Sequence, residues 1–94
     1  MSDEVVTHSL KTWPAPFAAV VRGEKTYEVR CSDRGYKVGD LLVLLEWDPE
    51  TEAYSGQTVL AVVNHMTASG EWGLPDDLCV MGISTIGAAR RWPR

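Results

Sequence analysis

The sequence predicts an α+β protein that is mainly β, a small β-barrel of about five strands with one or two short helices. Short apolar or alternating stretches follow one another with turn residues between them, and one early segment has a helical pattern. The 94 residues are enough for one hydrophobic core and not for two. We expect the sheet to be closed, because closure removes the exposed edges of a small β domain.

The clearest helix is expected over residues 14–22. It begins with a proline, which suits the first helical turn because the missing N–H would have no partner there. Phe17, Val20 and Val21 recur at a spacing that places them on one face. Gly23 ends the segment. The apolar face is expected to fill one opening of the barrel.

Strands are expected on both sides of this helix. Residues 26–31 alternate between two faces, and residues 41–47 are apolar up to Glu46, as in a strand that is covered on both faces. A polar hairpin loop joins 41–47 to 58–64, so these two strands should pair in antiparallel fashion. Trp47 ends a buried strand and is expected in the core. The expected strands are residues 5–10, 26–31, 41–47, 58–64 and 78–86.

The chain is expected to form one domain over residues 7–86, with an extension over 1–6 and a basic, flexible tail over 87–94. No apolar run approaches the roughly 20 residues of a membrane helix. The N-terminus is acidic, where a secretion signal would be basic. Cys31 and Cys79 form neither a disulfide framework nor a zinc motif. We therefore expect a cytoplasmic protein without a membrane partner.

Charge is distributed unevenly along the chain, although the net charge is −4. Residues 8–37 carry six basic and three acidic groups, whereas residues 38–86 carry eight acidic groups and no Lys or Arg. Such asymmetry indicates a surface with one side that attracts anions. Pairing of the cations with the later carboxylates is the alternative interpretation. The acidic half also leaves a protein partner open.

Spacing excludes several kinds of site. Residues 23–26 read Gly-Glu-Lys-Thr, but they lack the earlier glycine and the following helix of a phosphate-binding loop. His8 and His65 have no second metal ligand at a recognisable spacing. No Gly-x-Ser-x-Gly sequence is present. We therefore expect no metal, no cofactor and no hydrolase triad.

A charged cluster is the candidate site. Lys25, Glu28 and Arg30 lie within six residues, and Arg34 follows. Two cations beside a carboxylate favour its charged form, and their remaining donors suit a phosphate or a base edge. An ordinary salt-bridged strand face is the alternative. Strand parity places Lys25 opposite Glu28 and Arg30, so the three converge only if Lys25 belongs to the preceding turn.

Two tryptophans suggest contacts with bases. Trp13 precedes a proline and Trp72 lies between two glycines that are three positions apart, so both are at the ends of expected segments. Aromatic rings at such positions are often exposed and can stack on bases.

Several motifs, taken together and in order, resemble the DUF3850 family. They are His8-x-Leu10-Lys11-x-x-Pro14-x-x-Phe17, Gly23-x-Lys25-Thr26-x-Glu28-x-Arg30, Asp33-Arg34, Val38-Gly39-Asp40 and Glu46-Trp47-Asp48-Pro49-Glu50-Thr51. The resemblance covers residues 7–86. This family is placed in the ASCH/PUA-like superfamily and is frequent in phage and prophage genomes.

The resemblance implies a PUA-like barrel with a cleft beside the first helix, which binds RNA, another single-stranded nucleic acid or a modified base. Some superfamily relatives are hydrolases that deacetylate N4-acetylcytidine or cleave single-stranded RNA. The residues expected to contact the nucleic acid are Lys11, Trp13, Lys25, Thr26, Glu28, Arg30 and Arg34.

The enzymatic alternative is a small RNA-directed hydrolase with Lys25 and Glu28 as the catalytic proton-transfer pair. The nucleophilic threonine of the amidohydrolase branch corresponds to Glu28 here, and Thr26 is two positions early. A carboxylate cannot replace a hydroxyl nucleophile in the same acyl chemistry. The cluster also lacks a histidine, the usual proton carrier at neutral pH. A binding module is therefore favoured over an enzyme.

Overall fold

The computed structural model describes residues 4–91, which contain five strands, one α-helix and one short 3-10 helix. In chain order they are β1 (Thr7–Thr12), α1 (Pro14–Val21), β2 (Tyr27–Cys31), β3 (Leu41–Asp48), β4 (Ala53–Thr67), η1 (Glu71–Gly73) and β5 (Leu78–Arg91). The 3-10 helix η1 lies between β4 and β5, in a segment where no strand is expected from the sequence.

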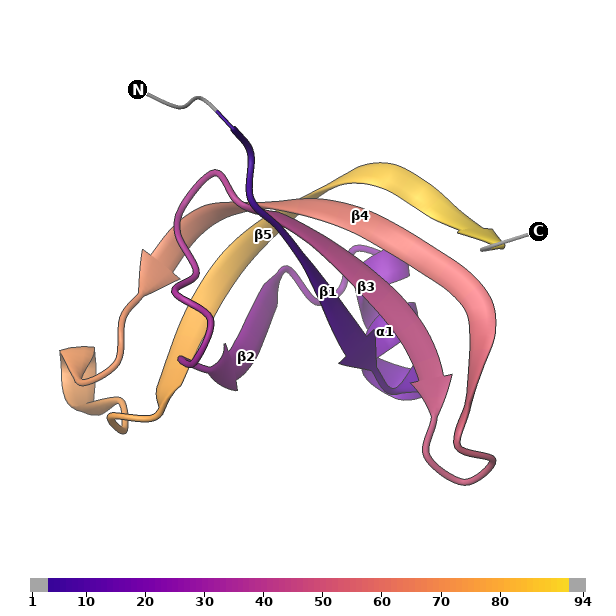
Figure 1. Ribbon diagram of the computed structural model, residues 1–94, viewed down its shortest axis with the longest axis horizontal. Coiled ribbons are helices and arrows are strands. Elements are labelled where there is room, and N and C mark those ends of the chain that lie inside the picture. Colours follow the sequence, from indigo (N-terminus) through magenta and orange to yellow (C-terminus); the bar gives the residue numbers. More distant parts are fainter. Residues whose placement is uncertain (1–3, 92–94) are drawn as a thin grey trace.

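The five strands form one sheet in the order β1-β3-β4-β5-β2, which curls like half of a barrel (Figure 1). β1 pairs with β3 in parallel, and all other neighbours are antiparallel. The expected hairpin of β3 and β4 is confirmed, from Leu41 opposite Val62 to Asp48 opposite Ala53. β1 and β2 are the edges, so the sheet of the described residues is open where a closed barrel was expected.

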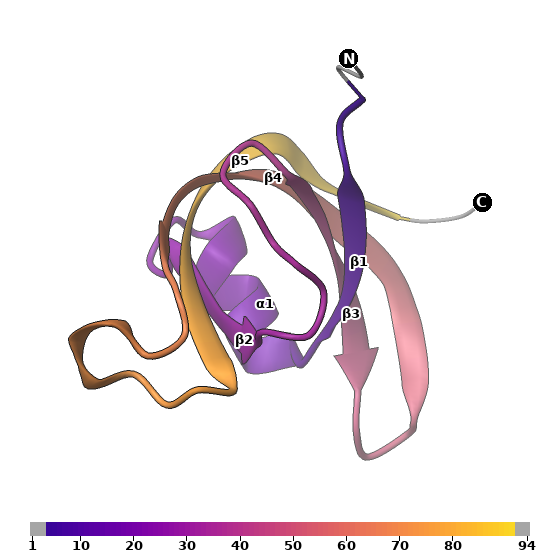
Figure 2. The ribbon, with the colours of Figure 1, turned by 60° about the vertical axis from the view of Figure 1, so that its left-hand side comes forward.

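Irregular pairing of β4 explains the curl of the sheet. Against β5, the register of β4 shifts between Thr58 and Leu60, between Leu60 and Ala61, and between Val63 and His65. Such bulges bend a strand and increase its twist. β4 therefore pairs with β3 along one edge and, along its other edge, with β5, which turns towards the opposite side of the half-barrel. The two arms of the sheet lie on either side of α1 (Figure 2).

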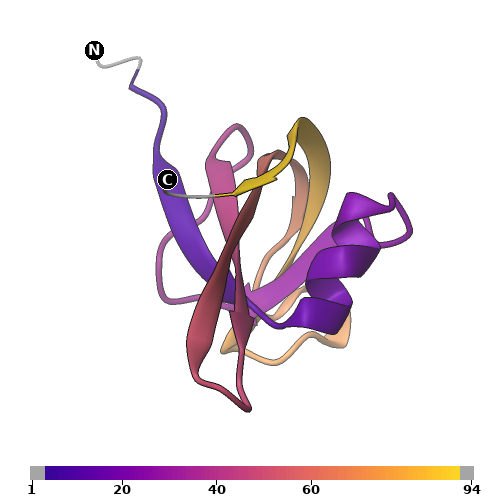
Figure 3. The same cartoon turned by 90° about the vertical axis from the view of Figure 1, so that its right-hand side faces the viewer.

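α1 fills one opening of the half-barrel. It follows β1 at one end of the curled sheet (Figure 3) and packs against β3 and β5. Phe17 and Val20 are 4% and 1% exposed and belong to the core, as expected. Val21 is 46% exposed, so its predicted burial is wrong. Only one narrow stripe of so short a helix faces the sheet, and Val21 lies beside that stripe.

The core lies on the inner face of the curled sheet. Leu42 and Leu44 of β3 are fully buried, but the residues between and beside them are partly exposed. The expectation that β3 is covered on both faces is therefore wrong, because a single helix covers only one face of a single sheet. Trp47 is partly exposed as well, which corrects its expected place in the core. The buried apolar residues are Leu10, Phe17, Val20, Tyr36, Leu42, Leu44, Val59, Ala61, Val63, Cys79, Met81 and Ile83.

β5 continues past its expected end at residue 86. Thr58 and Gln57 of the long strand β4 lie opposite Arg90 and Arg91, so the backbone of this stretch has a partner in the sheet. The part of the expected flexible tail that reaches Arg91 is therefore strand. Residues 92–94 of that tail, and residues 1–3 of the expected extension, lie outside the described residues. Within residues 4–91, no helix has the length and apolar character needed to cross a membrane.

A buried polar cluster fixes the loop between β2 and β3 to β1. The Nε2 atom of His8 lies 2.9 Å from Oδ2 of Asp40, and the backbone N–H of Lys37 donates to the same oxygen at 2.9 Å. The ring of Tyr36 meets His8 edge-on at 4.6 Å between centres. Burial alone would raise the pKa of Asp40, but its hydrogen bonds with His8 and Lys37 outweigh burial and hold the pKa below its ordinary value.

Phe17→Ala is expected to lower the free energy of unfolding by about 3–5 kcal/mol, because it leaves a cavity between α1 and the sheet. Val21→Ala is the matched control on the same helix, and we expect it to change stability by less than about 0.5 kcal/mol. Urea unfolding measures both values. A Phe17→Ala variant as stable as the wild type would show that α1 does not fill the half-barrel.

Asp40→Asn is expected to change how stability depends on pH. A lowered pKa in the folded state means that Asp40 stabilises the fold above its unfolded-state pKa of about 3.9, and that this stability is lost as the pH falls below it. The variant should therefore be less stable at neutral pH and lose less stability on acidification than the wild type. Thermal unfolding across this range measures the difference, with the exposed Asp77→Asn as control. Equal acid sensitivity of wild type and Asp40→Asn would contradict the assignment.

Candidate functional site

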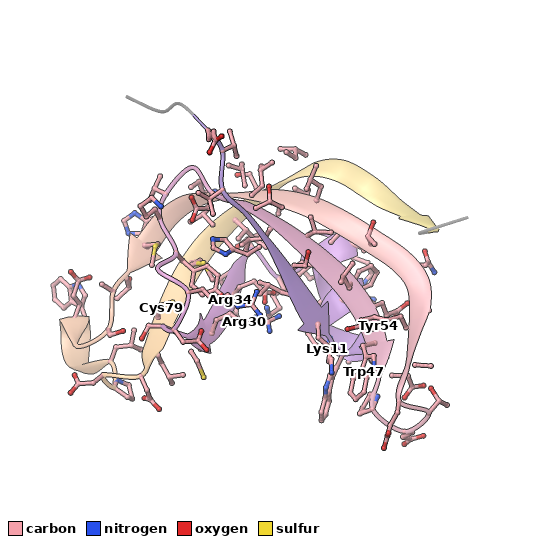
Figure 4. All side chains as sticks on the ribbon, in the orientation of Figure 1. Lys11, Arg30, Arg34, Trp47, Tyr54 and Cys79 are labelled. Atoms are coloured by element: carbon pink, nitrogen blue, oxygen red, sulfur yellow. The ribbon has the colours of Figure 1, made fainter. Side chains whose placement is uncertain are left out.

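Arginine side chains bridge the gap between the two edge strands, β1 and β2. Arg30 of β2 donates through Nη2 to the carbonyl oxygen of Lys11 at 3.2 Å and to the hydroxyl of Thr12 at 3.3 Å. Arg34, in the loop after β2, donates to the carbonyl oxygen of Ser9 at 3.0 Å. Both arginines lie between β1 and β2 (Figure 4). We call this line of bridges the seam, and it takes the place of backbone pairing between the edge strands.

Glu28 is at the centre of the charged cluster. Its side chain is 3% exposed, and its Oε2 accepts a hydrogen bond from Nζ of Lys25 at 2.8 Å. Its Oε1 accepts from Nε of Arg30 at 3.1 Å and lies 3.0 Å from Nη2 of the same residue. Lys25 precedes β2 and also donates to the carbonyl oxygen of Tyr27 at 2.6 Å. Lys25 belongs to the turn before β2 and not to the strand, so the alternation of the strand does not direct it away from Glu28 and Arg30. The three charged side chains therefore converge, as expected for a lysine in the turn.

A pocket of about 330 Å³, called the first pocket, opens beside this cluster. Trp13, directly before α1, is 57% exposed and lines this pocket. The ammonium group of Lys11 lies 4.1 Å from the ring centre of Trp47, and Figure 4 shows the two side chains together near the end of β1. The residues that line the first pocket are Lys11, Thr12, Trp13, Pro16, Lys25, Glu28, Val29 and Arg30.

A second pocket, of about 340 Å³, continues along the seam. It shares Val29 and Arg30 with the first pocket, so the two pockets adjoin at Arg30. Its other lining residues come from β1, the end of β2, the following loop and the start of β5. The residues that line the second pocket are Leu10, Val29, Arg30, Cys31, Asp33, Arg34, Tyr36 and Leu78.

The structure brings most of the expected contact residues together. Thr26 and Arg34 are the exceptions, because neither lines the first pocket. Arg34 lies in the second pocket instead, and the carbonyl oxygen of Thr26 accepts a backbone hydrogen bond from Ile83. The expected contact residues that line the first pocket are Lys11, Trp13, Lys25, Glu28 and Arg30.

Sequence reasoning missed Thr12 and did not predict a second pocket, although Arg30 and Arg34 of its lining were expected contact residues. Thr12 is 3% exposed, and its hydroxyl accepts from Arg30 and donates to the carbonyl oxygen of Leu10 at 3.2 Å. A stricter use of alternation could have found it, because residues 7–12 alternate between exposed and buried up to Thr12. The second pocket has no such signal, since it joins segments that are distant in sequence.

Most of the charged groups at the first pocket are hydrogen-bond donors. Three cations and one carboxylate surround it together with an exposed aromatic ring. In the part of the chain from residue 4 to 91, no three His, Cys, Asp or Glu side chains gather where they could hold a metal ion. The arrangement suits an anionic ligand that carries a flat ring.

Two comparisons with known proteins match this chain. A family described as "Domain of unknown function (DUF3850)" matches residues 7–83, a range that includes every residue lining the two pockets. The chain is also similar to an "Uncharacterized 12.9 kDa protein in GpA 3'region" of Escherichia phage P2, with 34% identity over 65 residues. The aligned part is 69% of this chain and 58% of the phage protein, so the chain matches less than two thirds of that protein.

Glu28→Ala is expected to lower the free energy of unfolding by about 1–3 kcal/mol, because it removes a buried acceptor that serves two cations. Glu24→Ala is the matched control. Glu24 pairs with Arg22 at 2.8 Å on the exposed surface, so its removal should have no measurable effect on stability. Urea unfolding compares the two variants. Equal effects would show that the Glu28 cluster is an ordinary surface salt bridge.

Proposed function

The chain belongs to the DUF3850 family, and we propose that it is the PUA-like module that its motifs imply and, from the geometry of its first pocket, that it holds single-stranded RNA. One observation carries this proposal. Lys11, Lys25 and Arg30 surround the same opening as the exposed ring of Trp13. Cations suit the phosphates of a nucleotide, and the aromatic ring suits its base.

The two cations that Glu28 engages keep donors for an anion. The ammonium group of Lys25 has three protons, and Tyr27 and Glu28 accept two of them. Arg30 uses Nε and Nη2 within the protein, while its Nη1 makes no hydrogen bond to residues 4–87. Glu28 is bonded through both oxygens and is almost inaccessible. We therefore give Glu28 the role of positioning Lys25 and Arg30, in place of a direct contact with a base.

Trp13 supplies the surface on which a base can stack. Its place directly before α1 leaves the ring exposed at the pocket. Stacking of a base on an aromatic ring contributes about 1–3 kcal/mol and is available to every base. Trp47 has a different role, because its ring lies beneath the ammonium group of Lys11 and holds this cation at the pocket.

The net charge of −4 limits the size of the binding site without preventing binding. The eight acidic groups of residues 38–86 are remote in sequence from the cations of the first pocket, and none of them lines it. They repel the rest of a nucleic-acid strand, so we expect only two or three phosphate contacts. Binding should accordingly be weak and only moderately sensitive to salt.

The wild type is expected to bind a labelled oligouridylate at low salt, with a slope of log K against log salt of about −1.4 to −2.1 for two or three contacts. Lys25→Ala should flatten this slope by about 0.7. Lys37→Ala is its matched control, because Lys37 is largely exposed and lies outside the pocket.

Trp13→Ala should weaken binding by about 5- to 150-fold without changing the slope. Trp72, the other tryptophan expected to contact bases, is exposed but lines neither pocket, so Trp72→Ala is its control. Fluorescence anisotropy at several salt concentrations gives all of these values.

Absence of binding by the wild type at low salt would contradict the proposal and favour a protein partner for the acidic half. Equal losses of affinity in the pocket variants and their controls would contradict it as well.

The same samples test the hydrolase alternative on a denaturing gel. Shortened RNA with the wild type but not with Lys25→Ala would indicate catalysis by Lys25 and Glu28. A DNA oligonucleotide of the same length tests the preference for RNA.

A further inference from the structure

The second pocket has the same scale as the first and adjoins it at Arg30. The volumes are about 330 and 340 Å³, at the lower end of the range for small-ligand sites of about 300–1,000 Å³. Both pockets lie along the seam, because each takes residues from β1 and from β2. One extended ligand could therefore occupy both pockets, with its central part at Arg30.

The walls of the second pocket suit a flat ring with polar edges. Val29 and Leu78 provide apolar surface, and the buried side chains of Leu10 and Tyr36 lie beneath it. Arg34 donates a hydrogen bond through Nη1 to the carbonyl oxygen of Ser9, and this bond fixes the guanidinium group at the pocket. Its remaining donors could bind the polar edge of a base or a phosphate.

Asp33, beside Arg34 in the second pocket, adds an acceptor. A carboxylate can accept a hydrogen bond from the exocyclic amine of a base. Recognition of a base requires hydrogen-bond donors and an acceptor beside an apolar surface, and the second pocket has all three.

We propose that the second pocket binds the next nucleotide of the strand held in the first pocket, so that the protein recognises two adjacent, unpaired nucleotides. The proposal rests on the proposed function of the first pocket. Arg30 would then face the phosphate that links the two nucleotides. Two separate pockets require two bases that are splayed apart, which single-stranded RNA permits and a duplex does not.

Two side chains report on the two pockets separately. The indole N–H of Trp13 gives an NMR signal at the first pocket, which Trp13→Phe assigns. The exposed thiol of Cys31 lines the second pocket, so its rate of alkylation reports on access to that pocket. Cys79 is 1% exposed, and burial raises the pKa of its thiol, so its reaction in the folded protein is slow.

The experiment compares uridine 5′-monophosphate with the dinucleotide pUpU. Both should shift the Trp13 signal. Only the dinucleotide should slow the alkylation of Cys31 by iodoacetamide, by about tenfold at a concentration ten times its Kd, because reaction then requires the free protein. Reversible blocking of Cys31 with a methanethiosulfonate reagent should reduce the affinity for pUpU to that for the mononucleotide, and a reductant should restore it. Cys31→Ser is the control that the reagent leaves unchanged.

Each other outcome overturns the proposal in a recognisable way. If pUpU shifts Trp13 but leaves the alkylation of Cys31 unchanged, the second pocket is not part of the site, and the proposed function still stands. Equal protection of Cys31 by the mononucleotide would show that the second pocket does not require a second nucleotide. If neither ligand, nor a longer oligouridylate, affects either reporter, the proposed function fails together with this inference.

Discussion

The ion pair between Glu28 and Arg30 is the interaction on which the site depends. The buried carboxylate fixes Nε of Arg30 at 3.1 Å, and this orientation lets Nη2 reach the carbonyl oxygen of Lys11 and the hydroxyl of Thr12 on the opposite edge strand. The same carboxylate also binds Lys25. A single acidic side chain therefore sets the position of two cations and the width of the seam. Its burial is tolerated because both oxygens are bonded to opposite charges.

The open seam links the fold to the site. Backbone hydrogen bonds between β1 and β2 would close the barrel and would bring these strands to about 4.8 Å, the spacing of neighbours in a sheet. Arginine side chains instead span a wider gap, and pockets lie beside them. Arg30 and Arg34 thus have two tasks, since they join the edge strands and leave donors directed to a ligand. A substitution at Arg30 or Arg34 therefore changes both the stability of the fold and the binding site.

Features of the fold that depend on local sequence could be predicted, and features that depend on distant partners could not. The start of α1, the hairpin of β3 with β4 and the entry of Lys25 from a turn follow from turn residues and alternation. The parallel pairing of β1 with β3 and the extension of β5 to Arg91 depend on strands that lie far along the chain. Trp47 shows a second kind of limit. Its apolar neighbours predict burial, but it lies one residue before the end of β3, where it is partly exposed and a lysine side chain lies over its ring.

We expect the parallel pairing of β1 with β3 to form late in folding. His8 meets Asp40 across 32 positions of sequence, and β1 can add only to a β3 strand that already exists. The local β3–β4 hairpin closes a short loop and can form early, whereas long-range contacts form slowly because of their loop-closure entropy. β1 and β2, the last strands on each side, are the two that line both pockets. We therefore expect the β3–β4 hairpin to form before the binding site is complete, and the edge strands that form the site to be the first lost by local unfolding.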